Sequence, residues 1–491
     1  MNREARTPVL VGIGTVQQRE QDPSLALEPI SLMTMALERA AEDAGSRKLL
    51  QRAGLVTVPR GFWSYSDPGR LVADAVGASQ ARTEVAELGV LQTTILGRAV
   101  QAIADGSLDV ALVTGGEAKY RELRGKITGA GAPIRQQSGA TPDSVLRPHG
   151  EILSPIELQR GLAMPVGFYA MIENAMRAAE GQSLDEHADD VARLWAGMSE
   201  VAAGNPNAWN RDTVSSDQVR KTDGGNRMLA FPYTKRHNSQ WNVDQAAGLI
   251  LCSVETARSL GIPRGKWVFP LAIAESNHMT SLTERRALHR CYGFVHAGRA
   301  VFDHVGCDIA AVSHRELYSC FPSAVRSQLR ELGIRDDRPV TVTGGMAFAG
   351  GPLNNFVLQG IARMIEVLRG DPGSRGLVTA VSGFLTKSGV SLWSTEPAER
   401  GFALGDVSKA TAAAVETVEV VGEAQGRAKI ASYTVLFAGE VPLKTVLACD
   451  LDDGRRALVS IADPELAATA MREELCGRTV RLSGADRAEL V

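Results

Sequence analysis

The hydrophobic pattern over residues 1–395 alternates between short apolar runs and amphipathic segments. PVLVGIGTV (8–16) has the length and apolar character of a buried strand, and ISLMTMALERAAEDAG (30–45) places apolar residues at helical spacing. Residues 93–105 predict a second helix, which leads into a continuous apolar strand over 109–114. A helix that feeds a fully buried strand is typical of a parallel sheet in an α/β fold.

The second half of this region repeats the plan. Residues 286–306 predict a helix, 307–318 a strand and 323–333 a helix. RPVTVTGG (338–345) then predicts a strand that ends in paired glycines, just as DVALVTGG (109–116) does in the first half. This internal repeat predicts two related βα halves.

The pattern changes between and after the two halves. The stretch between them is irregular, with Gly/Pro-rich patches, and a linker follows the second half at 396–404. Beyond the linker, five short strands separated by turn signals predict a small barrel or Greek-key module of the OB type. The predicted domains are an N-terminal half (1–118 and 231–262), a loop domain (119–230), a C-terminal half (263–395) and an OB-like module (405–491).

Composition narrows the classes of function. The 491 residues, 44% of them hydrophobic and 22% charged, are enough for two or three globular domains. A net charge of −3 and dispersed Lys and Arg give no reason to expect nucleic acid. No apolar run reaches the roughly 18 residues of a membrane span, and the N-terminal apolar stretch is too short for a signal peptide. The six cysteines form no CxxC or CxxH pair, which predicts reduced thiols in a cytoplasmic protein without a metal site.

Several motifs, taken together and in order, resemble the type 1 thiolase-like proteins, relatives of the sterol-carrier-protein thiolases. The resemblance covers nearly the whole chain. It implies a thiolase fold of two βαβαβαββ halves with a loop-domain insertion. It also implies a coenzyme A thioester as substrate or ligand, no prosthetic group, and a homodimer. The motifs are GFWSYSDPGR (61–70), PYTKRHNSQWNVDQAA (232–247), LYSCFPSAV (317–325), TVTGGMAFAGGPLNN (341–355) and FLTKSG (384–389).

The resemblance also locates the catalytic positions of thiolases in this chain. The nucleophilic cysteine falls on Gly89, and the histidine of the Gly-His-Pro block falls on Gly351. The block with the second cysteine falls on 380–383, where Ala380 stands and Ser382 is the one polar side chain. Because a glycine cannot carry an acyl group, the resemblance implies that thiolysis through an acyl-enzyme is lost.

The remaining block is Tyr-Ser-Cys-Phe at 318–321. Tyr318 stands where thiolases polarise the thioester oxygen, so its phenol can donate a hydrogen bond to an enolate or take a proton from a β-hydroxyl. The alternative is a core tyrosine that ends a strand. Cys320 is a candidate nucleophile, with a packed buried thiol as its alternative. His314, four residues before Tyr318 on the predicted strand, shares its face and can assist, or has a structural role.

Two further segments provide candidate binding residues. Glycine-rich turns after the second VTGG let backbone amides approach a thioester oxygen closely. A basic loop can meet the phosphates of coenzyme A or carry solvated surface charges, and its histidine is a base if the loop domain folds over the cleft, or a packed loop residue. The candidate binding residues are Gly344, Gly345, Gly350, Pro352, Lys235, Arg236 and His237.

Three functions fit these residues. The first is a thiolase-like acyl-CoA-dependent enzyme of the acyltransferase superfamily whose reaction is not thiolytic. The second is a retro-aldolase on a β-hydroxyacyl-CoA with Tyr318 in the acid/base role, since aldol cleavage needs no enzyme nucleophile. The third is a non-catalytic acyl-CoA-binding protein. The OB-like module has a competing interpretation as a single-strand nucleic-acid binder, but Tyr433 and Phe437 are its only aromatics, which favours a packing or substrate-tunnel role.

Overall fold

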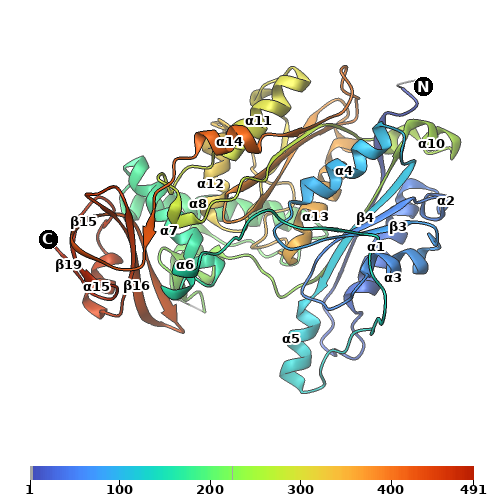
Figure 1. Ribbon diagram of the computed structural model, residues 1–491. Helices are drawn as coiled ribbons and strands as arrows, with labels where there is room; N and C mark the ends of the chain where they lie inside the picture. The colour runs from blue at the N-terminus through green and yellow to red at the C-terminus, as the bar shows by residue number, and fades with distance from the viewer. Residues whose placement is uncertain (1–3, 224) are drawn as a thin grey trace.

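The computed structural model describes residues 4–223 and 225–491, and its centre consists of two sheets with helices on both faces (Figure 1). The first sheet has the strand order β1-β8-β4-β2-β3-β5, and the second has the order β10-β11-β12-β9-β13. The first sheet comprises β1 (Pro8–Gln18), β2 (Leu55–Pro59), β3 (Arg82–Ala86), β4 (Val110–Ala118), β5 (Ser144–Leu146) and β8 (Asp244–Ser253). The second comprises β9 (Phe269–Ser276), β10 (His314–Glu316), β11 (Arg375–Ser382), β12 (Lys387–Ser394) and β13 (Ala403–Asp406).

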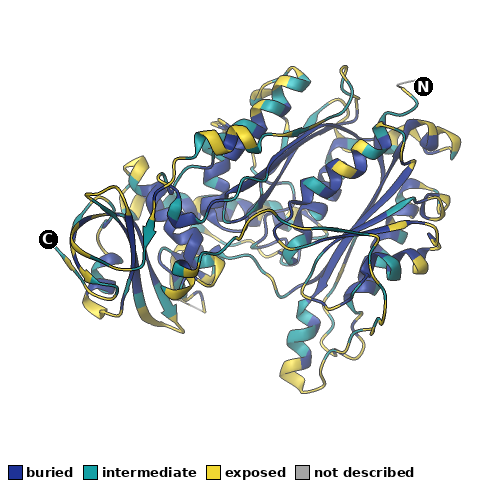
Figure 2. Cartoon of the chain, in the orientation of Figure 1, coloured by how far each residue is buried: buried dark blue, intermediate teal, exposed yellow. Residues whose placement is uncertain are grey.

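Helices α4 (Gln92–Ala104) and α13 (Phe356–Gly370) pack against strands of both sheets, so that they form the middle of five layers. Their apolar faces meet the inner faces of the sheets in one buried cluster that includes Leu10, Ile95 and Trp393. The strands are buried along most of their length (Figure 2). This layering confirms the predicted α/β thiolase fold.

The outer layers cover the remaining faces. Against the first sheet pack α1 (Pro29–Ala44) and α3 (Pro68–Val76), and against the second packs α11 (Tyr292–Val305), beside α12 (Pro322–Glu331). Within the described ranges, no helix is long and apolar enough to cross a membrane. The other helices are α2 (Lys48–Gln51), α5 (Lys119–Thr128), α6 (Pro155–Gln159), α7 (Pro165–Glu180), α8 (Leu184–Gly204), α9 (Ser216–Arg220), α10 (Val254–Ser259), α14 (Ser408–Ala414) and α15 (Pro464–Ala470).

The C-terminal region is strand-rich, as predicted, and forms a sheet of its own beside α7 (Figure 1). The long strand β15 pairs with β16 over one part of its length and with β18 over another, and register shifts along it bend the strand. A closed OB barrel remains a prediction. The strands are β14 (Val420–Val421), β15 (Ala424–Ala438), β16 (Val441–Leu451), β17 (Arg456–Ile461), β18 (Thr479–Gly484) and β19 (Ala488–Leu490), with β6 (Met228–Ala230) and β7 (Tyr233–Thr234) added from the middle of the chain.

Two strand predictions for the second half were wrong, one because the strand is shorter and the other because no strand forms. The strand predicted over 307–318 is confined to β10, and residues 338–345 form no strand. Glu316 explains the second difference, because its buried carboxylate accepts the amide hydrogens of Val342 (2.9 Å) and Thr343 (2.8 Å). Those amides are therefore not available to a neighbouring strand.

Strand β3 of the first sheet is covered on its outer side by β5. Strand β5 pairs in parallel with β3, from Glu84 opposite Ser144 to Ala86 opposite Leu146. An uncovered edge strand offers unpaired amides and carbonyls to a second chain, and here a short strand of the same chain takes that place. The homodimer expected from thiolases stays a prediction.

Candidate functional site

Gly89, which the sequence resemblance aligns with the thiolase nucleophile, lies in the turn before α4, and neighbouring groups pack closely around it. Its φ is +95°, and a Cβ built there would lie 3.0 Å from the Cβ of Pro148 and 3.2 Å from the Cδ1 of Ile152. The buried Lys387 donates from Nζ to the Gly89 carbonyl at 3.2 Å. A side chain at this position would require the 148–152 segment to move.

The general-base position, Gly351, is also closely packed. Its amide donates to the carbonyl of Gln240 at 2.8 Å. An added Cβ would lie 3.0 Å from the Cβ of Ser239 and 3.3 Å from the Cε of Met346. A side chain at this position would require both neighbours to shift by a few tenths of an ångström.

The block at 318–321 brings two tyrosines and a thiol together. Tyr318 is half-buried and makes an edge contact with Phe356, with ring centroids 6.0 Å apart. Cys320 is buried, and its thiol lies next to the hydroxyl of the buried Tyr169 from α7. Tyr169 was missed in the sequence, where nothing distinguishes it from the other apolar and aromatic residues of α7.

These groups keep their protons at neutral pH. Burial, and after it the neighbouring Cys320, raises the pKa of Tyr318, and burial likewise raises the pKa of Tyr169 well above its ordinary value. Burial raises the pKa of the Cys320 thiol to about 12. The cluster therefore offers hydrogen-bond donors, whereas a thiolate nucleophile or a phenolate base is disfavoured.

The fourth block, 380–383, lies at the end of β11 and the start of the turn that joins β11 to β12. Ala380 is buried within β11, and Ser382, at its end, pairs with Lys387 across the hairpin. In the turn, Phe384 stacks on Phe168 with ring centroids 4.1 Å apart, and it meets Tyr169 edge-on at 6.0 Å. The turn thus packs against the same α7 residues that flank Cys320.

The glycine-rich turns have their amides bonded within the protein. The amides of Gly344 (2.9 Å) and Gly345 (3.1 Å) both donate to the hydroxyl of Thr341. Gly344 lies against α8, where an added Cβ would come 2.3 Å from the Cβ of Ala202. Gly350 lies against Gln245 in the same way, and Pro352 is buried. Close packing is enough to explain why these positions are occupied by glycine, without an approach of the backbone to a thioester oxygen.

The basic loop and the histidines are dispersed. Lys235 is exposed, and Arg236 donates to the carbonyl of Gln218. His237 is buried beside Trp195 and Tyr233, and burial lowers its pKa to about 4, so its ring is neutral. Its Nε2 has no partner among the described residues. His314 does not meet Tyr318, because its ring contacts Asp371 at the surface.

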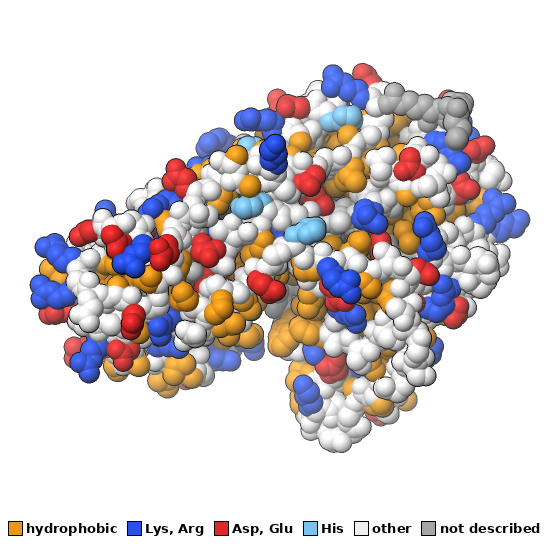
Figure 3. Space-filling model, viewed as in Figure 1, with side chains coloured by type: hydrophobic (Ala, Val, Ile, Leu, Met, Phe, Trp, Pro, Cys, Tyr) orange, Lys and Arg blue, Asp and Glu red, His pale blue; other side chains and the backbone are white. Residues whose placement is uncertain are grey.

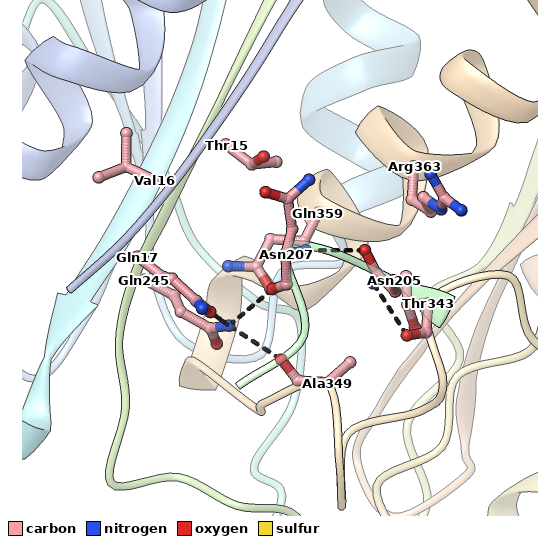
Figure 4. A pocket seen from close by; sticks show the side chains of 10 residues that line it. All are labelled: Thr15, Val16, Gln17, Asn205, Asn207, Gln245, Thr343, Ala349, Gln359 and Arg363. Carbon is pink, nitrogen blue, oxygen red and sulfur yellow. Dashed lines mark hydrogen bonds between the residues drawn. The ribbon is translucent and has the colours of Figure 1, made fainter. Parts of the chain in front are cut away.

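A small amide-lined cavity lies where the two halves meet (Figure 4). Gln245 donates to the Ala349 carbonyl at 2.8 Å, and Asn205 donates to the Thr343 carbonyl at 2.9 Å. The free volume of about 20 Å³ is room for roughly one water. The described residues contain no cluster of His, Cys, Asp or Glu arranged to hold a metal ion.

Comparisons with known proteins identify the class of this fold. Residues 408–486 match the family described as the thiolase-like protein type 1 additional C-terminal domain. An acetyl-CoA acetyltransferase of Methanothermobacter thermautotrophicus is 25% identical over 236 residues, which are 45% of this chain and 58% of that protein. The chain thus spans little more than half of that relative. The Ltp2–ChsH2(DUF35) aldolase is similar in fold, with a TM-score of 0.61 and 19% identity over 80% of this chain and 99% of that one. The class is that of the thiolase-fold proteins.

A full-length comparison narrows the class. The monomeric SCP2-thiolase-like protein type 1 of Mycobacterium smegmatis superposes with a TM-score of 0.82, at 27% identity, over 99% of both chains. Together with the match of the C-terminal domain, this similarity shows that the chain has the fold of the type 1 thiolase-like proteins over its full length and resembles them in its C-terminal domain.

Proposed function

We propose that this protein acts on an acyl-CoA thioester without a covalent intermediate, by holding the thioester oxygen with neutral hydrogen-bond donors. The observation that carries the proposal is the cluster of Tyr318, Cys320 and Tyr169, whose groups all remain protonated at neutral pH. Tyr318 is the only one of the three with a partly exposed side chain, so it is the donor that a ligand can reach.

The two lost thiolase positions support a non-thiolytic reaction. Thiolysis needs a nucleophile to carry the acyl group and a base to activate the incoming thiol. Gly89 and Gly351 provide neither, and a Cβ added at either position would lie 3.0 Å from a neighbouring side chain. Stabilisation of a developing oxyanion or enolate needs only preorganised donors, which the tyrosine cluster retains.

Retro-aldol cleavage of a β-hydroxyacyl-CoA is the second candidate. It needs donors for the enolate and one acceptor for the hydroxyl proton. A phenol with a raised pKa fits the donor part, so Tyr318 would serve as an acid and not as the base. His237 does not provide that acceptor, because its Nδ1 accepts the Thr234 amide hydrogen at 3.0 Å and the proton of the neutral ring is therefore on Nε2. A non-catalytic acyl-CoA-binding protein is the outcome in which the donors bind the thioester but no bond is cleaved.

The test combines three measurements on the purified full-length protein. We expect acetyl-CoA to bind by titration calorimetry and to leave the intact protein mass unchanged. We expect 3-hydroxyacyl-CoA to release a shorter acyl-CoA, detected by chromatography. Tyr318→Phe should lower that rate by about 10²-fold, the usual effect of losing one oxyanion donor. Tyr120→Phe, whose hydroxyl interacts with Gln21 on the surface, is the matched control and should keep the rate.

Two results would contradict the proposal. One is an acyl adduct on any residue, which would restore covalent catalysis. The other is equal binding and turnover in the wild type and in Tyr318→Phe, which would remove the tyrosine cluster from the function.

A further inference from the structure

A second cavity lies where the second thiolase half meets the C-terminal domain. It has a volume of about 160 Å³, several times the roughly 30 Å³ of a water in the liquid. One wall comes from the segment before α11 and the other from the end of α14. Its lining consists of Arg285, Arg286, Ala287, Arg290, Tyr292, Ala414, Val415 and Glu416.

Three guanidinium groups in this lining are only partly neutralised. Arg290 is paired with Glu331, through Nε to Oε1 at 2.9 Å and Nη2 to Oε2 at 3.0 Å. In the described ranges neither Arg285 nor Arg286 forms an ion pair, and the lining contains a single carboxylate, that of Glu416. The cavity therefore has an excess of positive charge.

The guanidinium of Arg285 has a hydrogen-bond donor without an acceptor in the described part of the chain. The residue is only 5% exposed. Its Nη2 donates to the carbonyls of Gly383 (3.1 Å) and Phe384 (2.8 Å), whereas its Nε has no hydrogen-bond partner among the described residues. A buried guanidinium nitrogen without an acceptor is unfavourable unless a ligand or water provides one.

The backbone around the arginines is fixed from both domains. The Arg286 amide donates to the Glu416 carbonyl at 2.9 Å. From β17 the fully buried Arg456 donates to the carbonyls of Arg285 (2.6 Å) and Arg286 (3.1 Å). The 14-residue helix α11 begins at Tyr292 in the cavity wall, so the positive end of its dipole adds to the field there.

We propose that this cavity, which we call the arginine pocket, binds a phosphate group, either free or carried by a small molecule. The planar guanidinium presents its donors in a fork that matches phosphate oxygens, and it is favoured for this purpose over the ammonium of lysine. Arg285 lines the pocket and has an unpartnered Nε, and the exposed Arg286 donates from Nη2 to the Gly454 carbonyl at 3.2 Å and has further guanidinium donors. Binding of this ligand does not require acyl-CoA, although Arg285 also donates to the 383–384 turn that packs against Tyr169.

Titration calorimetry at constant ionic strength tests the arginine pocket with three probes: inorganic phosphate, inorganic pyrophosphate and adenosine 3′,5′-bisphosphate. We expect at least one probe to bind the wild type with a stoichiometry near one. Tighter binding of the bisphosphate would identify a phosphate monoester as the natural ligand, and tighter binding of an inorganic probe would identify a free anion.

Variants of exposed residues keep the test independent of folding. Arg286→Gln should weaken binding by about tenfold or more, because it removes a charge-assisted donor. Glu416→Gln should strengthen binding several-fold, since it removes the competing carboxylate. Arg427→Gln, at an exposed arginine of β15 outside the pocket, is the matched control and should leave the affinity unchanged. Absence of binding by all three probes, or wild-type affinity in Arg286→Gln, would overturn the proposal.

Discussion

Residues 110–116 and 340–345 end in the same four residues, Val-Thr-Gly-Gly, and yet adopt different structures. The first segment is β4, which pairs antiparallel with β8 on one side and parallel with β2 on the other. Gly115 and Gly116 continue that strand with ordinary extended backbone. The second segment is not a strand, and its glycines have φ angles of +101° and +76°.

The difference comes from the groups that accept the backbone hydrogens. In β4 the partners are the carbonyls of two neighbouring strands. In 340–345 the carboxylate of Glu316 accepts the amides of Val342 and Thr343 together with the hydroxyls of Thr341 and Thr343. One buried side chain thus satisfies the donors that a strand would otherwise have used. A short sequence with strand preference becomes a strand only where a strand partner is available.

Among three tests of this difference, removal of the Glu316 carboxylate should cause the largest change in the free energy of unfolding. Glu316→Ala leaves the two buried amides and the threonine hydroxyls without their acceptor, so we expect a loss of about 3–5 kcal/mol in the free energy of unfolding. Urea unfolding followed by circular dichroism measures it. Glu316→Gln, which keeps one carbonyl acceptor, should lose about half as much. A loss below about 1 kcal/mol in Glu316→Ala would show that the loop does not depend on this residue.

The paired glycines provide the second test. Gly344→Ala combines a φ of +101° with a Cβ 2.3 Å from Ala202 on α8, so we expect a loss of about 2–4 kcal/mol. Gly115→Ala is the matched substitution in β4. Its added Cβ meets Oδ1 of Asn355 at 2.6 Å and Cγ of Pro59 at 2.9 Å, but its backbone needs no left-handed angle. Thermal unfolding should show the larger decrease in Tm for Gly344→Ala, and the reverse order would contradict the assigned backbone conformations.

Substitution of the residue after the paired glycines should have the smallest effect of the three. In β4 it is Glu117, and burial raises the pKa of its carboxyl from 4.5 to about 7. The folded state therefore binds a proton more tightly than the unfolded state, and this contribution to stability is full below pH 4.5 and is lost as the pH rises to 7. In the other segment the equivalent residue is Met346, which does not titrate. Glu117→Gln should reduce the decrease in unfolding free energy between pH 4.5 and 7 by about 1–3 kcal/mol. An unchanged pH profile would assign the pH dependence to other groups.

The arrangement of strands and helices along the chain was largely predictable from the sequence. β1, α1, α4 and β4 lie where apolar periodicity placed them, and the strand-rich C-terminal region begins after the predicted linker. These features depend on local spacing, since a helix or strand buries one face whatever its eventual partner. The resemblance to thiolases, read from sequence motifs, also predicted glycine in place of the nucleophile at position 89 and of the base at position 351, and hence the proposal of a reaction without an acyl-enzyme.

Only the tertiary structure decided the rest, because it depends on which groups meet across long sequence separations. Tyr169 lies next to Cys320, Lys387 closes the Gly89 turn, and Arg456 fixes the backbone of Arg285 and Arg286, although each is more than a hundred residues away in the chain. The same is true of residues 338–345, where a predicted strand gave way to a loop. Local sequence determines what a segment can form, whereas the position of a single buried carboxylate determined what this segment became.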